Sequence, residues 1–378
     1  MPPIRILVVD DSSVVRKVLS DGLASDPDLN VVATAASGQI ALSKIPQCNP
    51  DLVTLDVEMP GMNGLETLAA IRKAYPKLPV IMFSTLTERG AATTLDALAL
   101  GATDYATKPA NTGSLDVTLA QIRAQLIPKV KALCPSPASA PPKTAATMSP
   151  AAMPSAREDA RIDVLAIGAS TGGPNALAEL LPAIPEDFPV PVVIAQHMPP
   201  VFTRLLAARL NDRCALGVQE GRAGEVLKPG EAWIAPGDHH MTVERVGTSV
   251  RLGLNQGPPE NSCRPAVDPL FRSVAKTFGN HVLAVVLTGM GFDGVNGAGH
   301  IRERGGQVFV QDEASSVVWG MPGQVAAAGY ANRIFPLPAL AQEIIRRVAL
   351  HRIVPAVALR STAVPEPNAP REGYKSGS

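Results

Sequence analysis

Short, mostly apolar runs alternate with longer helical patterns in two blocks of this chain, and this alternation limits the fold more than any other feature. The runs of the first block are Ile6–Val9, Val31–Ala35, Leu52–Leu55, Val80–Phe83 and Asp104–Thr107. Those of the second are Val164–Ile167, Val192–Ala195, Glu231–Ala235, Leu283–Leu287 and Gln307–Val310. Continuous apolar strands separated by helices are typical of parallel sheets covered on both faces. The sequence therefore predicts the α/β fold class, with a doubly wound parallel sheet in each block.

A segment that cannot build a core separates the two blocks. Of the 23 residues in 134–156, 19 are Ala, Ser, Pro or Thr, and none is Leu, Ile, Val or Phe. Such a segment buries too little apolar surface to offset its ordering entropy. We expect a first domain over residues 1–130, a linker over 131–160, a second domain over 161–352 and a disordered tail over 353–378.

Composition argues against several kinds of partner. Lys+Arg and Asp+Glu number 34 each, and aromatic residues make up 4% of the chain, so we expect no binding of nucleic acid. No run reaches the about 20 apolar residues that cross a bilayer, so we expect no membrane insertion. The scattered cysteines fit neither a disulfide framework nor a zinc site, which indicates a reducing, cytoplasmic location. They are Cys48, Cys134, Cys214 and Cys263.

Carboxylates gather at strand ends in the first block. Asp10 and Asp11 close the first strand and Asp56 closes the third, and these strands are neighbours if the order is the flavodoxin-like 2-1-3-4-5. Three converging carboxylates need a compensating cation, and Mg²⁺ is the usual one. Ser84 and Lys108 end the fourth and fifth strands. The set suits an Asp that attacks a phosphoryl donor while metal and Lys neutralise the phosphoryl oxygens.

The first block resembles the receiver domain of two-component response regulators over nearly its full length. The matching segments are ILVVDDSSVVRKVL, PDLVTLDVEMPGMNGLETL, VIMFSTLT and GATDYATKPA. The resemblance implies that Asp56 accepts the phosphoryl group. It also implies a Mg²⁺ site of Asp10, Asp11 and Asp56, and a switch set of Ser84, Tyr105 and Lys108.

The second block carries a serine, a histidine and an aspartate at predicted strand ends. Ser170 is at the apex of a Gly-rich turn that matches Gly-x-Ser-x-Gly, and His197 follows the strand in PVPVVIAQ. Asp293 lies in LTGMGFDG, where the glycines leave backbone N–H groups free, and the N–H of Met290 is our candidate oxyanion donor. This pattern predicts a nucleophile, its general base and the acid that orients the base.

Competing interpretations of these residues remain open from sequence. A Gly-rich turn also binds phosphate, which would make the chain a phosphorylation-switched binding module. Cys263 could supply a catalytic thiol, but the sequence assigns it no base of its own. His239 and His240 could line the same cleft. Glu260 and Arg264 are candidates for a wall that meets the substrate, and Trp319 and Met321 are expected to pack.

The second block resembles the catalytic domain of the chemotaxis protein-glutamate methylesterases, the CheB family. The matching segments are AIGASTGGP, AQHMPPVFT, WIAPGDHHM, NQGPPENSCRPAVDPLFRSVA, LTGMGFDG and QDEASSVVWGMPG. The resemblance implies hydrolysis of glutamate methyl esters on the cytoplasmic helices of chemoreceptors, with methanol released, and deamidation of receptor glutamines. It also implies that the chemotaxis histidine kinase phosphorylates Asp56 and thereby lifts the receiver off the catalytic cleft. Catalysis itself would need no cofactor.

Overall fold

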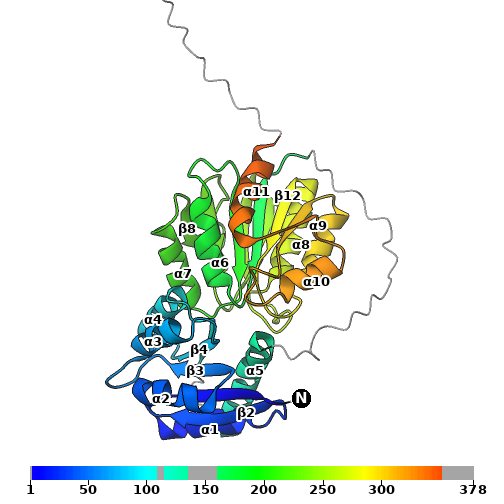
Figure 1. Cartoon of the computed structure of the whole chain (residues 1–378). Coiled ribbons are helices and arrows are strands. Elements are labelled where there is room, and N and C mark those ends of the chain that lie inside the picture. The colour runs from blue at the N-terminus through cyan, green and yellow to red at the C-terminus, as the bar shows by residue number, and fades with distance from the viewer. Residues whose placement is uncertain (1, 109–114, 135–159, 351–378) are drawn as a thin grey trace, which may run out of the picture.

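The computed structural model describes residues 2–108, 115–134 and 160–350. They form two α/β domains that meet end to end (Figure 1). Most of the predicted linker and the whole predicted tail lie outside the described residues. Helix α5 (Leu115–Leu133) extends a few residues past the boundary expected at 130.

The first domain is built on a five-stranded parallel sheet of order β2-β1-β3-β4-β5, which confirms the flavodoxin-like order expected from sequence. Because β1 and β3 are neighbours, their carboxyl ends bring the predicted acidic residues to one edge of the sheet. The strands are β1 (Ile4–Val9), β2 (Leu29–Ala35), β3 (Leu52–Asp56), β4 (Val80–Ser84) and β5 (Asp104–Thr107).

Helices cover both faces of this sheet. Successive apolar side chains of a strand point to opposite faces, so each face needs a covering layer. Ile6 and Val8 pack with α1 and α5, while Leu7 and Val9 pack with α2, α3 and α4. Side-chain caps fix several helix starts; at α3, Asn63 and Glu66 form a reciprocal capping box. The remaining helices are α1 (Ser13–Leu23), α2 (Gly38–Cys48), α3 (Gly64–Ala74) and α4 (Glu88–Ala99).

The second domain has a seven-stranded parallel sheet of order β14-β13-β12-β6-β7-β9-β8. Its first strand lies in the middle, so the order reverses beside β6, where doubly wound sheets bind ligands. The predicted second doubly wound sheet is thus confirmed. The strands are β6 (Val164–Ala169), β7 (Val192–Gln196), β8 (Gly217–Glu220), β9 (Glu231–Ile234), β12 (Val282–Val286), β13 (Gln307–Gln311) and β14 (Arg333–Phe335).

Two layers enclose the seven-stranded sheet. Helices α6 (Gly173–Leu180), α7 (Phe202–Asn211) and α11 (Leu337–Ala349) pack on one face. Helices α8 (Val267–Phe278), α9 (Val295–Glu303) and α10 (Met321–Ala327) pack on the other, together with the antiparallel hairpin of β10 (His240–Val246) and β11 (Ser249–Asn255). None of the described helices is long and apolar enough to cross a bilayer.

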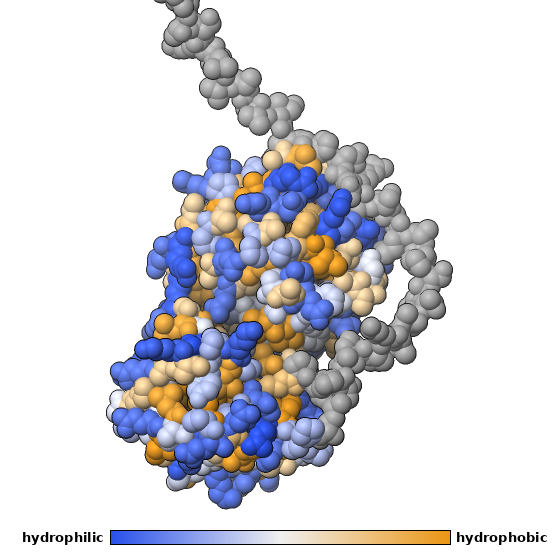
Figure 2. All heavy atoms as spheres, in the orientation of Figure 1, coloured by the Kyte–Doolittle hydropathy of each residue, from blue (hydrophilic) through white to orange (hydrophobic). Residues whose placement is uncertain are grey.

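The two domains share an apolar interface. One buried cluster runs from α4 and β5 of the first domain into α6 and α7 of the second. The ring of Tyr105 stacks on that of Phe202, with centroids 4.8 Å apart and planes 10° from parallel. Apolar surface gathers where the domains meet (Figure 2). The first domain is therefore packed against the second through a buried apolar interface.

Candidate active site

Ser170 lies in the turn between β6 and α6, at the carboxyl end of the sheet. Gly172 has a φ of +78°, and a Cβ on Gly173 would lie only 2.0 Å from the Oε1 of Gln196, so both positions require glycine. The Ser170 amide donates to the Thr288 carbonyl at 3.1 Å, and the Gly173 amide donates to the Ser170 carbonyl at 2.8 Å. The Gly173 amide is therefore already hydrogen-bonded within the turn, which argues against a phosphate ligand at that amide.

His197 directly follows β7, the neighbour of β6, and therefore reaches Ser170. The His197 Nδ1 lies 3.1 Å from the Ser170 Oγ. Gln196 ties the two loops together: its Nε2 donates to the Ser170 carbonyl at 3.0 Å and to the His197 carbonyl at 3.4 Å. Gln196 is 1% exposed, and its role cannot be predicted from the sequence because an amide at a strand end carries no chemical signature.

Asp293 follows β12, which flanks β6 on the other side. Its Oδ2 lies 2.7 Å from the Nε2 of His197. The buried carboxylate accepts further hydrogen bonds from the Asn261 Nδ2 at 2.7 Å and from three backbone N–H groups, those of Val267, Asp268 and Gly294. The structure thus brings together the three residues that the sequence singled out, from three adjacent strands.

The imidazole points its two nitrogens at different partners. With Nε2 facing a carboxylate, the neutral ring carries its proton on Nε2, which leaves the lone pair of Nδ1 directed at Ser170. Burial lowers the pKa of His197, but the hydrogen bond to Asp293 and the contact with Cys263 outweigh it, so the pKa lies above 6.5. Burial raises the pKa of Asp293, and the hydrogen bonds from His197 and the Val267 amide bring it below 3.8.

The loop of Met290 lies against the serine. A Cβ on Gly289 would lie 2.8 Å from the Ser170 Cβ, so this backbone approaches the nucleophile as closely as glycine allows. In the described part of the chain, the Met290 N–H donates to no protein group. An unengaged amide beside the serine is what an oxyanion site requires.

Cys263 is closer to this site than the sequence suggested. Its Sγ lies 3.4 Å from the His197 Nδ1, the same nitrogen that faces Ser170. The thiol therefore shares the histidine with Ser170, a relation that residues 66 positions apart in the chain do not reveal. The same loop carries Asn261, whose Nδ2 also reaches Asp268 at 2.9 Å, and Asn261 was missed as well.

Other candidates divide between the cavity and the protein interior. Arg264 lines the cavity and is paired with Asp238, whereas Glu260 is paired with Arg272 and does not line it. Neither His239 nor His240 lines it; His240 is buried against the Pro258 carbonyl. Trp319 and Met321 pack as expected: the Trp319 Nε1 donates to the Gln311 carbonyl, and Met321 is fully buried.

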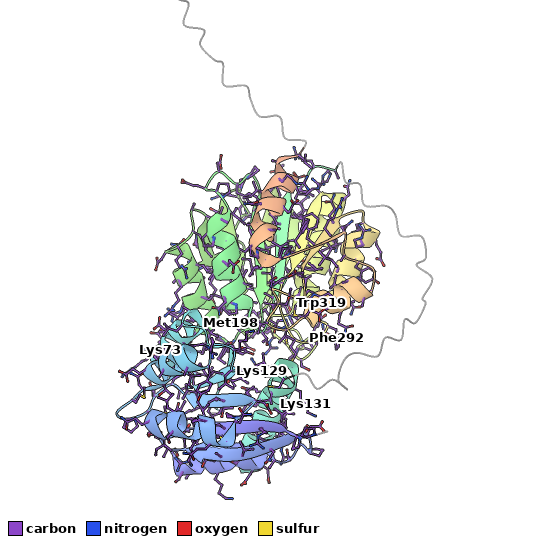
Figure 3. All side chains as sticks on the ribbon, in the orientation of Figure 1. Lys73, Lys129, Lys131, Met198, Phe292 and Trp319 are labelled. Carbon is purple, nitrogen blue, oxygen red and sulfur yellow. The ribbon has the colours of Figure 1, made fainter. Side chains whose placement is uncertain are left out.

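The first domain covers the site and leaves a cavity of about 550 Å³ beneath it. The walls come from Ser170, His197 and Asp293 on one side and from β5 and α5 on the other. Figure 3 shows Met198 and Phe292 of the second domain facing Lys129 of α5. The Thr171 hydroxyl, next to Ser170, donates to the Asp104 Oδ2 at 3.0 Å, and Lys129 pairs with the same carboxylate at 2.5 Å.

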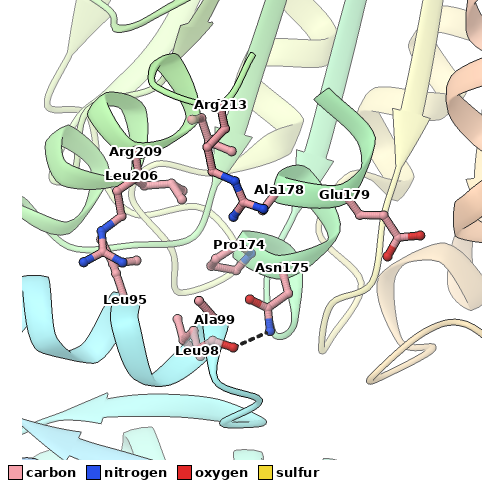
Figure 4. A pocket seen from close by; sticks show the side chains of 11 residues that line it. Leu95, Leu98, Ala99, Pro174, Asn175, Ala178, Glu179, Leu206, Arg209 and Arg213 are labelled. Carbon is pink, nitrogen blue, oxygen red and sulfur yellow. Dashed lines mark hydrogen bonds between the residues drawn. The ribbon is translucent and has the colours of Figure 1, made fainter. Parts of the chain in front are cut away.

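A second cavity of about 360 Å³ lies farther along the interface, between α4 and the helices α6 and α7 (Figure 4). The Asn175 Nδ2 donates to the Leu98 carbonyl at 3.0 Å, and Arg209 binds both the Ala92 carbonyl and Asp96. Arg204 also pairs with Glu88 across the interface. These polar contacts are partly exposed, so the buried apolar cluster contributes more to docking than they do.

The acidic site of the first domain forms as the strand order predicts. One carboxylate oxygen from each of Asp10, Asp11 and Asp56 falls within a 4.8 Å span. The Lys108 Nζ lies 2.8 Å from Asp56 and 3.0 Å from Asp10. Asp56 and Asp11 open onto a cavity of about 600 Å³, whose rim includes Lys108. Ser84 is buried at the end of β4, and Tyr105 lies in the domain interface and does not line this cavity.

The charge balance of this site favours a cation. Burial raises the pKa of Asp56 to about 6, and the neighbouring charge of Asp10 adds to this although Lys108 opposes it. Asp10 and Asp56 are buried and Asp11 is exposed, so one ammonium for three carboxylates leaves net negative charge at a partly buried site. An oxygen-rich, under-compensated cluster matches the donors that Mg²⁺ prefers.

Both domains match known protein families. Residues 6–120 match the response regulator receiver domain, and residues 165–344 match CheB methylesterase. A protein of Trichodesmium erythraeum, named protein-glutamate methylesterase/protein-glutamine glutaminase, is 55% identical over 92% of this chain and 100% of its own. A relative with the same name from a Nocardioides species is 52% identical over 95% of this chain and 100% of its own.

Among solved structures, the CheB methylesterase catalytic domain of Thermotoga maritima is 40% identical and covers 50% of this chain and 99% of its own, with a TM-score of 0.48. The two family matches cover both domains, and the two relatives align over their whole length with more than nine-tenths of this chain. The chain belongs to the CheB family of protein-glutamate methylesterase/protein-glutamine glutaminases.

Proposed function

We propose that this protein hydrolyses glutamate γ-methyl esters on the cytoplasmic helices of chemoreceptors and deamidates particular receptor glutamines, and that phosphorylation of Asp56 controls both reactions. The observation that carries the proposal is the Ser170–His197–Asp293 arrangement, assembled beneath a domain that gathers three carboxylates and Lys108 at its own strand ends. The names of the full-length relatives support the two activities.

The proposed chemistry needs only groups of this chain. The Ser170 Oγ attacks the ester carbonyl while the His197 Nδ1 takes its proton, and the Met290 amide stabilises the oxyanion. The imidazolium, held by Asp293, then protonates the departing methanol. Water hydrolyses the acyl-enzyme by the same route and leaves glutamate. With a glutamine substrate, ammonia leaves in place of methanol.

Regulation is proposed to act through the interface. Phosphorylation adds charge beside Lys108, and that charge biases the docked and released arrangements of the receiver differently. Asp10, Asp11 and Asp56 would hold the Mg²⁺ that neutralises phosphoryl oxygens during transfer. The chemotaxis histidine kinase is the proposed phosphodonor. Release would expose the cleft to receptor helices in the cytoplasm.

Methanol release from methylated receptor membranes tests this proposal. Ser170→Ala should lower the rate about 10³-fold or more, because removal of a triad nucleophile leaves only binding and oxyanion stabilisation. Ammonia release from a receptor carrying the unmodified glutamines tests the second activity with the same variant. A Ser170→Ala protein that keeps a tenth of the wild-type rate would exclude the assignment.

Phosphorylation is tested on the full chain with Mg²⁺ and phosphoramidate as donor. We expect the wild-type rate to rise and Asp56→Asn to lose the response. The Asp56→Asn protein is the matched control, because it differs at the phosphorylation site alone and keeps the catalytic residues. An equal response in both proteins would contradict control through Asp56.

A further inference from the structure

The docked receiver leaves the catalytic residues assembled. The Ser170 Oγ is 3.1 Å from the His197 Nδ1, and the His197 Nε2 is 2.7 Å from Asp293, although the receiver covers them. Within the described residues, no receiver side chain makes a hydrogen bond to any of these three. Asp104 of the receiver accepts a hydrogen bond from the hydroxyl of Thr171, one residue away from the nucleophile. Docking therefore does not divide the triad.

The receiver covers the cleft and does not fill it. The receiver side of the cavity is lined by Tyr105, Gln125, Pro128 and Lys129. About 550 Å³ stays free between these residues and the nucleophile. Pockets for small ligands have volumes of about 300–1,000 Å³. On one side the rim is open to solvent, since Gly291 is exposed and the Phe292 side chain is 58% exposed. In Figure 3, Phe292 lies at the edge of the domain, beside α5.

A receptor helix cannot use this space. A helix about 10 Å across, with a pitch of about 5.4 Å, occupies about 400 Å³ for each turn. The cavity is thus comparable with at most a few turns, and β5 and α5 close one side of it, whereas a glutamyl ester on a receptor is attached to a continuous helix. The covered cleft distinguishes between substrates by their size, because only a small molecule reaches Ser170 while the receiver is docked.

We propose that the unphosphorylated protein is already an esterase for small, soluble carboxylic esters, and that the receiver excludes only esters attached to protein helices. The inference rests on the proposed function, since it specifies which substrates the docked receiver keeps away from Ser170. In the reaction, the Ser170 Oγ forms a bond to the acyl carbon and the bond from that carbon to the alcohol oxygen breaks. His197 passes the serine proton to the alcohol, and water then releases the acid and restores Ser170.

The experiment compares three substrates on the full chain, with and without Mg²⁺ and phosphoramidate. They are p-nitrophenyl acetate, the γ-methyl ester of N-acetylglutamate amide, and methylated receptor. Phosphoramidate contains no ester and so does not compete for Ser170. Asp56→Asn controls for phosphorylation, and Ser170→Ala controls for hydrolysis at any other place on the protein.

We expect kcat/KM for the two small esters to change less than about threefold on phosphorylation, while that for the receptor rises at least tenfold. Ser170→Ala should abolish hydrolysis of all three substrates. If small-ester hydrolysis rises on phosphorylation in proportion to receptor hydrolysis, the receiver disables the catalytic centre itself and the inference is wrong. Receptor hydrolysis without any Ser170-dependent hydrolysis of small esters would also overturn it, and would leave the proposed function intact.

The reverse result separates the two proposals. Small-ester hydrolysis that requires Ser170 and does not depend on phosphorylation, with no methanol released from receptor in either state, would support the esterase inference. It would at the same time refute the proposed receptor substrate.

Discussion

Replacing Tyr105 with alanine should release the receiver from the catalytic domain without touching the catalytic residues. Tyr105 is 7% exposed, and its ring stacks on Phe202 across the interface. Burying a large apolar side chain is worth about 1.5–3 kcal/mol, and a stacked aromatic pair adds about 0.5–1.5 kcal/mol. Because part of the ring packs within the receiver itself, we take a docking loss of about 2–4 kcal/mol. At about 1.4 kcal/mol per factor of ten, the docking constant falls about 30- to 700-fold.

The assay is methanol release from methylated receptor by the full chain without a phosphodonor. Tyr105→Ala should raise this basal rate toward that of the phosphorylated wild-type protein, which sets the upper limit. Tyr105→Phe is the matched control, because it keeps the stacked ring, and no described residue forms a hydrogen bond with the phenol. It should stay within about twofold of wild type. A basal rate of Tyr105→Ala equal to wild type, in a folded protein that still accepts phosphate, would refute this account of docking.

Two further predictions follow from the titrating groups. Activity on small esters needs neutral His197, whose pKa is raised in part by Cys263, so activity should increase with pH through an inflection above 6.5. Cys263→Ala should move that inflection of kcat/KM to lower pH, and an inflection that stays in place would contradict the contact. The pKa of Asp56 is about 6 when folded against 3.8 unfolded, so the folded state binds more protons between these values and loses stability as pH rises through them. The free energy of unfolding of Asp56→Asn, measured in denaturant titrations, should therefore rise relative to that of wild type between pH 4 and 7, by at most about 3 kcal/mol. Mg²⁺ should reduce this difference between the two proteins. A difference that shrinks with rising pH would exclude this explanation.

The residues that sequence reasoning identified are those with chemistry at the end of a buried parallel strand. Ser170 and His197 directly follow β6 and β7, where an apolar run stops at a polar residue, and Asp293 lies in the Gly-rich loop after β12. The five strands predicted for the receiver also appear, in the predicted order. Buried strands can be recognised in the sequence because both of their faces are apolar.

The strands that were missed lie at the edges of the main sheet or outside it, and the missed site residues depend on contacts distant in sequence. Strands β8 and β14 are short edge strands with exposed positions, and the hairpin of β10 and β11 alternates apolar and polar residues outside the main sheet. Gln196 and Asn261 act through amide hydrogen bonds, and amides at these places have no sequence signature. The proximity of Cys263 to His197 depends on how its loop folds back.

The cavity between the domains has a thermodynamic consequence for any compound that fills it. Such a compound would touch residues of both domains and would therefore bind the docked arrangement more tightly than the released one. Linkage is reciprocal: the factor by which phosphorylation of Asp56 weakens its binding is the factor by which the bound compound disfavours the phosphorylated state. A metabolite or inhibitor bound there would oppose phosphorylation of Asp56 from a cavity that Asp56 does not line.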